Sequence, residues 1–297
     1  MQIKKVAILG AGAVGSYVIW GLSQAENLSL GVIAEGERAG RLKENGCLIN
    51  GQVYRPEVWT PKEAHGADLL IVSLMSLMNG VDSEEIIAQK VNPDNILHAL
   101  IKVASHKEEN GYCFNPETTI GIIFGEIKPP FESERVQAVC TLFENAQIHF
   151  RVTDYIKEEM WSKFRLNVCN NLPQAILGAG VGCYSDSTHM KAISEGLKKE
   201  LEAIAQAKGI DIGKADKSSS HGSAVPPKTR YSTLQDLDAG RHTEIDMFSG
   251  ALMRMGKELG IPTPYNEYTY HIIKALEEKN DGKFDYSKDT QESTWSK

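Results

Sequence analysis

The chain has 297 residues, of which 41% are hydrophobic and 24% charged, which is typical of a soluble globular protein with one large domain or two ordinary ones. Its net charge of −7 argues against an electrostatic nucleic-acid interface. No apolar run is long enough to span a bilayer, and the N-terminus lacks the long apolar region and cleavage site of a signal peptide.

Cysteine and histidine usage argues against disulfide and metal sites. The cysteines are odd in number and form no C-x-x-C pair; they stand at positions 47, 113, 140, 169 and 183. Scattered thiols of this kind predict a reducing, cytoplasmic environment rather than a disulfide framework or a zinc site. The eight histidines show no metal-binding spacing, so we expect no metal centre.

The N-terminal part of the chain has the pattern of an α/β domain. A short apolar strand over residues 3–9 is followed by a glycine loop, by a helix through about Gln24 and by a second strand over 28–34. This βαβ start predicts a parallel sheet with helical crossovers. Further strand-like runs occupy residues 67–73, 95–105 and 119–126.

After about Arg151 the strand signals stop. Helical patterns follow over residues 154–177, 188–209 and 244–260, with a Ser/Gly/Pro/Lys-rich loop at 213–230. We therefore predict an α/β domain over residues 1–153 and an all-helical domain over 154–297. The apolar faces of these helices fit a homodimer interface and a closed core equally well.

The glycine loop after the first strand matches G-x-G-x-x-G, in the order Gly10, Ala11, Gly12, Ala13, Val14 and Gly15. The first glycine makes the tight turn, the second allows the backbone to approach a pyrophosphate, and the third permits close helix–strand packing. The N-terminus of the following helix attracts the anion. Because the loop lies between a strand and a helix, it predicts a dinucleotide site.

The residues after the second strand do not decide between NAD and NADP as the coenzyme. Glu35 stands where an acidic side chain would bind the ribose 2′-hydroxyl of NAD and repel the 2′-phosphate of NADP. Arg38 and Arg41 follow closely, and either could hold that phosphate. Each of these three side chains would also suit a solvated loop.

A polar row marks the predicted helix around Trp161. Lys163, Asn167 and Asn171 are spaced four residues apart, so on an α-helix they would lie along one face. Such a row on an otherwise apolar helix is either a solvated edge or the wall of a site.

Four segments together resemble the ketopantoate reductase (2-dehydropantoate 2-reductase) family. That family has G-x-G-x-x-G, an asparagine-glycine pair after a central strand, W-x-K-(L/F)-x-x-N-x-x-x-N, and S-(S/T)-(M/L)-x-Q-D…R-x-T-E. In this chain they correspond to Gly10–Gly15, Asn79-Gly80, Trp161–Asn171 and Ser232–Glu244. The resemblance covers nearly the whole chain, and its two C-terminal motifs are the specific ones.

The resemblance implies a Rossmann domain followed by a helical domain, similar to 6-phosphogluconate dehydrogenase, with NADP as the family's coenzyme and NAD an alternative because of Glu35. By position, Lys163 resembles the proton donor and Glu244 the carboxylate that helps to hold cofactor and substrate. Substrate-contacting positions are matched by Asn79, which also lies near the nicotinamide, and by Asn167, Asn171 and Ser232.

These residue types suit the reduction of a 2-keto acid, which needs a hydride on C2 and a proton on the oxygen. An ammonium group can stabilise and protonate the developing alkoxide, while amides and a hydroxyl can orient the substrate. Structural roles are open as well. Asn167 and Asn171 could be buried amides that bond the backbone, Ser232 a helix N-cap, and Glu244 a first-turn partner of the helix dipole.

The resemblance implies reduction of 2-dehydropantoate to D-pantoate, on the route to pantothenate and coenzyme A. One alternative is an NADH-dependent D-2-hydroxyacid dehydrogenase acting on branched-chain 2-keto acids. Another is a non-catalytic dinucleotide-binding protein.

The chain departs from the family between residues 67 and 80. Two strand-like pieces, 67–73 and 74–80, abut near Ser73 and Leu74, although neighbouring parallel strands need a connection of about a dozen residues. The family's cofactor-side lysine after the first piece is missing too. Either a deletion has fused two strands, or the sequence omits a segment at this point.

Overall fold

The computed structural model describes residues 2–72, 80–103, 105–108, 111–218 and 225–286. The chain divides into two compact units, Met1–Met160 and Trp161–Lys297. The first unit mixes strands and helices, and the described part of the second is helical, so the predicted fold class is confirmed. The predicted boundary at residue 153 follows β11 (Phe150–Val152), the last strand among the described residues, and lies seven residues before the end of the first unit.

The first unit contains both strands and helices. In chain order its elements are β1 (Lys5–Leu9), α1 (Ala13–Leu22), β2 (Ser29–Ile33), α2 (Gly36–Asn45), β3 (Cys47–Ile49), β4 (Gln52–Tyr54), β5 (Glu57–Trp59), α3 (Pro61–Ala64), β6 (Leu69–Val72), α4 (Ser83–Ala88), the 3₁₀ turn η1 (Pro93–Asn95), β7 (His98–Lys102), β8 (His106–Lys107), β9 (Tyr112–Cys113), β10 (Gly121–Gly125), α5 (Glu134–Asn145) and β11 (Phe150–Val152).

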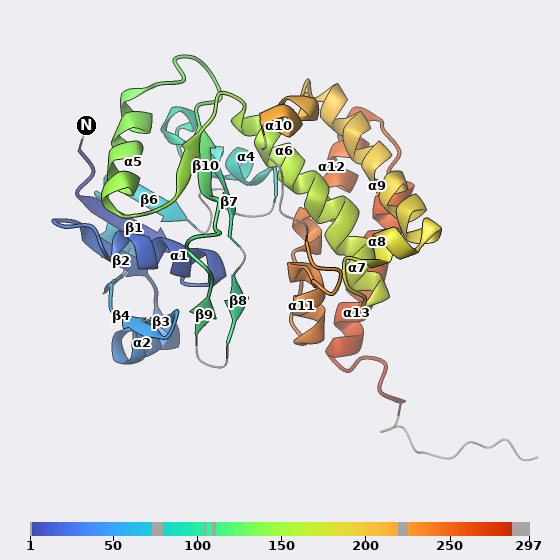
Figure 1. Ribbon diagram of the computed structural model, residues 1–297, viewed down its shortest axis with the longest axis horizontal. Coiled ribbons are helices and arrows are strands. Elements are labelled where there is room, and N and C mark those ends of the chain that lie inside the picture. Colours follow the sequence, from blue (N-terminus) through green and yellow to red (C-terminus); the bar gives the residue numbers. More distant parts are fainter. Residues whose placement is uncertain (1, 73–79, 104, 109–110, 219–224, 287–297) are drawn as a thin grey trace, which may run out of the picture. The chain divides into compact units, whose positions relative to one another are not determined.

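This unit contains a parallel sheet in the order β5-β2-β1-β6, of which β1, β2 and β6 are labelled in Figure 1. Leu9 at the end of β1 pairs with Ile33 on β2 and with Val72 on β6, so these strands end at one common edge. Val6, Ala7 and Ile8 are fully buried in β1, because a central parallel strand is covered on both faces. The predicted strands 3–9, 28–34 and 67–73 are thus confirmed as β1, β2 and β6, and the predicted first helix is α1.

The predicted strands 95–105 and 119–126 are also present, as β7 and β10, but they pair antiparallel rather than parallel. The chain between them contains the short antiparallel pair β8 and β9 instead of a crossover helix. Antiparallel strands can be joined without a crossover helix. The unit therefore has a second sheet, β11-β10-β7, and a third, β4-β3-β9-β8, and the parallel sheet with helical crossovers predicted from the βαβ start does not extend to β7 and β10.

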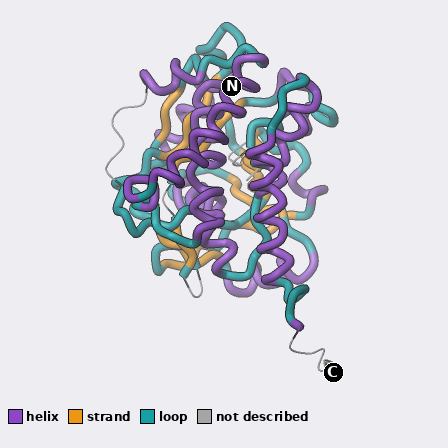
Figure 2. Tube along the Cα trace, turned by 90° about the vertical axis from the view of Figure 1, so that its right-hand side faces the viewer, coloured by secondary structure: helices purple, strands orange, loops and turns teal. Residues whose placement is uncertain are grey.

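The second unit is built from helices, and the described chain leading to the C-terminus is helix and loop in Figure 2. Helix α6 (Ile156–Leu166) enters it and is followed by the π-helical turn η2 (Asn167–Asn171), α7 (Leu172–Leu177), α8 (Cys183–Asp186), α9 (Thr188–Ala207), α10 (Ile212–Ser218), α11 (Ser232–Asp238), the 3₁₀ turn η3 (Ile245–Met247), α12 (Ser249–Leu259) and α13 (Pro264–Asn280).

Two helix predictions need correction. The single helix predicted over 154–177 is interrupted by η2, and the helix predicted over 244–260 begins as η3 before α12. A π turn adds one residue to an otherwise helical pattern, and in a segment this short that shift does not stand out from the periodicity of an α-helix. Among the described residues, no helix is long and apolar enough to cross a membrane.

Candidate active site

The glycine loop of the first unit leaves the N-terminus of α1 open. Gly10 adopts a φ of 108°, a conformation that side chains with a Cβ rarely take. Gly12 is the N-cap of α1, and a Cβ built on it would meet nothing within 4 Å. The first turn of α1 carries no acidic side chain. This opening therefore combines free space with the positive end of a helix dipole, which fits a pyrophosphate.

The coenzyme-selecting residues follow the neighbouring strand at the same edge of the sheet. Because Leu9 pairs with Ile33, the glycine loop and Glu35 leave the sheet side by side. Glu35 is the N-cap of α2 and is exposed, as are Arg38 and Arg41 on that helix. An exposed carboxylate and two exposed guanidinium groups thus lie next to the loop that fits a pyrophosphate.

Asn79 and the Ser73–Leu74 junction lie outside the described residues. The last residue of strand β6, Val72, pairs with Leu9, so this end of β6 lies at the glycine-loop edge of the sheet. The next described element is α4, beginning at Ser83.

In the second unit, the predicted row of polar side chains spans a change of helix type. Lys163 lies in α6 and is partly buried. Asn167 and Asn171 are the first and last residues of η2, and they are 5% and 4% exposed. The Asn171 amide donates to Asn167 Oδ1 at 3.2 Å. The two asparagines therefore meet as predicted, but on a π turn rather than on a regular α-helix.

The Asn171 side chain is left with an unsatisfied acceptor. Its Oδ1 is buried and has no hydrogen-bond partner among the described residues. Buried polar atoms are nearly always paired, so an unpaired one calls for a ligand or an ordered water. The alternative in which both asparagine amides are fully used by the backbone does not describe Asn171.

Tyr184 and Cys169, at the π turn, are not candidate catalytic groups. The Tyr184 hydroxyl donates to the Asn170 carbonyl, and burial raises the pKa of Tyr184, so it remains a donor. Burial also raises the pKa of Cys169 to about 12, which keeps this cysteine a neutral thiol rather than a nucleophile.

Ser232 begins α11, which packs against both η2 and α7. The N-cap of α11 is Tyr231, whose side chain makes no capping bond, so the N-cap role weighed for Ser232 was wrong. Ser232 is exposed. Four residues on, Asp236 Oδ1 accepts from Arg241 Nε at 2.9 Å and Nη2 at 2.7 Å, a structural ion pair beside the Ser232 helix.

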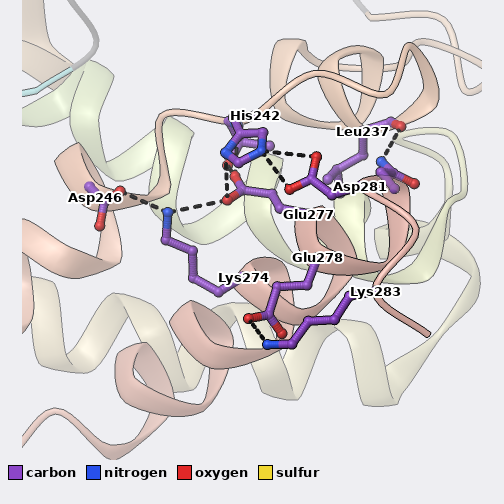
Figure 3. A network of polar contacts seen from close by, with 10 residues as sticks. Leu237, His242, Asp246, Lys274, Glu277, Glu278, Asp281 and Lys283 are labelled. Carbon is purple, nitrogen blue, oxygen red and sulfur yellow. Dashed lines mark hydrogen bonds and ion pairs between the residues drawn. The ribbon is translucent and has the colours of Figure 1, made fainter.

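Glu244 is partly buried and lies at the N-cap of η3, not in the first turn of α12 as the helix-dipole alternative required. Figure 3 shows how α13 holds the chain around it. Glu277 Oε1 accepts from both the backbone N and the hydroxyl of Thr243, each at 2.7 Å. Lys274 Nζ bridges Asp246 at 2.9 Å and Glu277 at 3.2 Å.

Sequence reasoning missed Glu277, which is 2% exposed. The available signal was its spacing: it follows the fully buried Ile273 by four residues and so shares its helix face. No group of three or more potential metal ligands occurs among the described residues. All five cysteines are described, and each is free.

Two sequence models of one protein family match the chain. The model described as ketopantoate reductase PanE/ApbA matches residues 6–74, and that described as ketopantoate reductase PanE/ApbA C terminal matches residues 155–277. A relative named 2-dehydropantoate 2-reductase, from Archaeoglobus fulgidus, is 23% identical over 93% of this chain and 99% of its own length.

Solved structures share the fold over the same extent. A PanE/ApbA family ketopantoate reductase from Ralstonia eutropha JMP134 superposes with a TM-score of 0.75 at 22% identity, covering 93% of this chain and 99% of that one. A complex of D-mandelate dehydrogenase with NADH gives 0.76 at 21% identity with the same coverage. At these identities the structural likeness shows the fold alone.

Proposed function

Because this chain belongs to the ketopantoate reductase PanE/ApbA family and is an NAD(P)H-dependent oxidoreductase, we propose that it reduces 2-dehydropantoate to D-pantoate, a step toward pantothenate and coenzyme A. The full-length match to relatives named for this reaction supports the proposal.

The unpartnered Asn171 Oδ1 is the observation that carries the choice of substrate. An amide oxygen only accepts hydrogen bonds, so the group that satisfies it must be a donor. 2-Dehydropantoate has a hydroxyl group at the end opposite its carboxylate, whereas simple branched-chain 2-keto acids have none. A buried acceptor of this kind favours the hydroxylated substrate.

Lys163 is proposed as the proton donor. When bound, the reduced nicotinamide supplies the hydride to C2 of the keto acid. The Lys163 ammonium donates a hydrogen bond to the keto oxygen, stabilises its growing negative charge and passes a proton to it. Lys163 is left as a neutral amine that takes up a proton from solvent.

The other predicted site residues orient the reactants. Asn167 and Ser232 bond the substrate without adding charge, so they fix its position without opposing its carboxylate. Glu244 helps to hold the substrate and the cofactor and keeps Lys163 charged. Asn79 is assigned by sequence alone to contact with both substrate and nicotinamide.

The dinucleotide is proposed to bind along the glycine loop, from Gly10 to Gly15, with its adenosine ribose at α2. Arg38 favours the 2′-phosphate of NADPH, as the family does, and Glu35 favours the 2′-hydroxyl of NADH. We further propose a cytoplasmic location, which the free cysteines support. A homodimer remains a prediction.

The test is the initial rate of 2-dehydropantoate reduction, followed at the nicotinamide absorbance with NADPH and NADH in parallel. 2-Ketoisovalerate and 2-ketoisocaproate serve as matched substrates without the hydroxyl. We expect kcat/KM to favour 2-dehydropantoate by more than about tenfold, equivalent to about 1.4 kcal/mol. A smaller preference contradicts the proposed substrate.

The second candidate is an NADH-dependent D-2-hydroxyacid dehydrogenase for branched-chain 2-keto acids, favoured by the exposed Glu35 after β2. It predicts faster turnover of the unhydroxylated acids and a preference for NADH. Cofactor binding with no turnover of any keto acid would instead support the non-catalytic alternative.

A further inference from the structure

We propose that Gln174 is a positioning residue that sets the place of the Ser232 hydroxyl relative to Asn171. Gln174 is the third residue of α7 and is fully buried, with 0% of its surface exposed. It was not among the predicted site residues. The inference rests on the proposed function, because it assigns Gln174 a role in binding the same substrate.

Both ends of the Gln174 amide bond the backbone that leads into α11. Nε2 donates to the Thr229 carbonyl at 2.9 Å, and Oε1 accepts from the Tyr231 amide at 2.8 Å. One side chain therefore fixes a donor and an acceptor two residues apart. Ser232 follows Tyr231 directly, so the bond to Tyr231 also fixes where the chain turns into α11.

The chain before Tyr231 is held by the loop after α7 as well. Val181 N donates to the Thr229 carbonyl at 2.9 Å, and Gly182 N donates to the Pro227 carbonyl at 2.8 Å. A Cβ added to Gly180 would lie 2.4 Å from the Pro227 carbonyl oxygen, so this contact is tight. The Tyr231 amide, in contrast, is held by Gln174, next to the residue proposed to bind substrate.

The position of Gln174 on its helix explains why it can couple two parts of the site. It lies three residues after Asn171, and residues three apart share a helix face. Asn171 and Gln174 therefore move with the same backbone, and Gln174 ties that backbone to the segment carrying Ser232. An error of about 1 Å in such a spacing can cost about a hundredfold in rate.

A buried amide is costly unless its hydrogen bonds are made, so an apolar residue of similar size would be a simpler way to fill this space. The geometry points to alignment of Ser232, rather than packing alone, as the role of the Gln174 amide.

The experiment compares Gln174→Met, which keeps the length of the side chain but makes neither bond, with Ser232→Ala and with the double variant. In the full-length enzyme we expect Gln174→Met to raise the KM for 2-dehydropantoate about tenfold and to leave the KM for NADPH within about twofold. Ser232→Ala should cost less in the Gln174→Met background than in the parent, because the hydroxyl is already misplaced there.

Asn280→Ala is the matched control. Asn280 Nδ2 donates to the Leu237 carbonyl at 2.8 Å, so it holds the far end of α11. We expect its KM to equal that of the parent. If Gln174→Met fails to fold, Gln174→Glu replaces it: Glu keeps the acceptor for Tyr231, and a KM between those expected for the parent and for Gln174→Met supports the proposal.

Two results would overturn the positioning role of Gln174 but not the proposed function. One is a lower melting temperature with an unchanged KM in Gln174→Met. The other is a double variant whose change in KM equals the product of the changes in Gln174→Met and Ser232→Ala. A parent that reduces other 2-keto acids but not 2-dehydropantoate would overturn the proposed substrate, and the same cycle is then run with the acid it reduces. A parent that reduces no 2-keto acid would overturn both.

Discussion

In the second unit, the buried carboxylates of Glu200 and Glu277 are surrounded by donors, whereas in the first unit Glu84 and His98 each have a buried atom without a partner. Glu200 accepts from the backbone of Tyr265 and from the backbone and side chain of Asn266 at 2.7–3.0 Å. Glu84 Oε1 and His98 Nδ1 have no hydrogen-bond partner among the described residues.

The difference concerns two titratable groups of the first unit. Burial raises the pKa of Glu84 to about 7, and burial with the charges of Lys157 and Arg135 lowers that of His98 to about 4. Two of the unsatisfied buried atoms among the described residues cannot titrate, Ser105 Oγ in the first unit and Asn171 Oδ1 in the second. A titratable group can respond to burial by a change of charge, whereas a hydroxyl or an amide needs a partner, and at Asn171 this fits the proposed substrate.

The largest expected effect concerns Glu277, a buried carboxylate of the second unit that is surrounded by hydrogen-bond donors. Glu277→Ala removes the acceptor of Thr243 and a partner of Lys274, so we expect a loss of about 4 kcal/mol in the free energy of unfolding, measured by urea denaturation. The neighbouring Glu278 bonds Lys283 at 2.6 Å on the surface, and Glu278→Ala should cost less than about 1 kcal/mol. Equal losses would contradict a special role for the buried carboxylate.

The next effect is the pH dependence of the first unit. Because the folded pKa of Glu84 is about 7 against an ordinary 4.5, its stabilising contribution is complete below pH 4.5 and declines as pH rises to 7. The decline corresponds to about 3 kcal/mol. His98 acts in the opposite direction, since its folded pKa of about 4 is below the ordinary 6.5 and stability is lost as pH falls through that window.

Glu84→Gln should remove the Glu84 contribution and leave that of His98, so the free energy of unfolding should rise with pH more steeply than in the parent between pH 4.5 and 6.5, as followed by denaturant midpoints. Glu117→Gln changes an exposed carboxylate of the first unit and should leave the profile as in the parent. A parent-like profile in Glu84→Gln would show that Glu84 does not titrate in this range.

Lys163→Ala tests the proposed proton donor in the second unit. We expect kcat to fall about a hundredfold or more, equivalent to about 2.7 kcal/mol, with the melting temperature unchanged. Lys163→Arg should not recover the full rate, because a guanidinium does not readily release its proton. Lys199→Ala, an exposed lysine of α9, is the control; a parent-like rate in Lys163→Ala would remove Lys163 from the mechanism.

The smallest effect concerns coenzyme choice in the first unit. If Glu35 repels a 2′-phosphate, Glu35→Ala should raise the ratio of kcat/KM for NADPH to that for NADH about tenfold, or about 1.4 kcal/mol. Glu37→Ala, exposed on the same helix, should leave the ratio unchanged. No difference between the two variants would assign Glu35 to the solvated surface.

What could be predicted from the sequence depended on how local the determining interactions were. The strand, glycine loop and helix around Gly10 follow from neighbouring residues and were found. The antiparallel pairing of β7 with β10 depends on partners far apart in the chain, so it was missed. Among the candidate site residues, the spacing of Asn167 and Asn171 was readable, but the anchors Gln174 and Glu277 look like ordinary helix residues until the backbone they bond is known.

The π turn at Asn167–Asn171 has a consequence for insertions and deletions in this family. A π turn is equivalent to an α-helix that has gained one residue. Deletion of Asn170 would allow α6 and α7 to join as a regular α-helix, with the residues after the deletion kept on their present helix face. A homologue with a one-residue gap here could therefore keep the fold and lose the π turn, and with it the spacing that brings the Asn171 amide to Asn167 Oδ1.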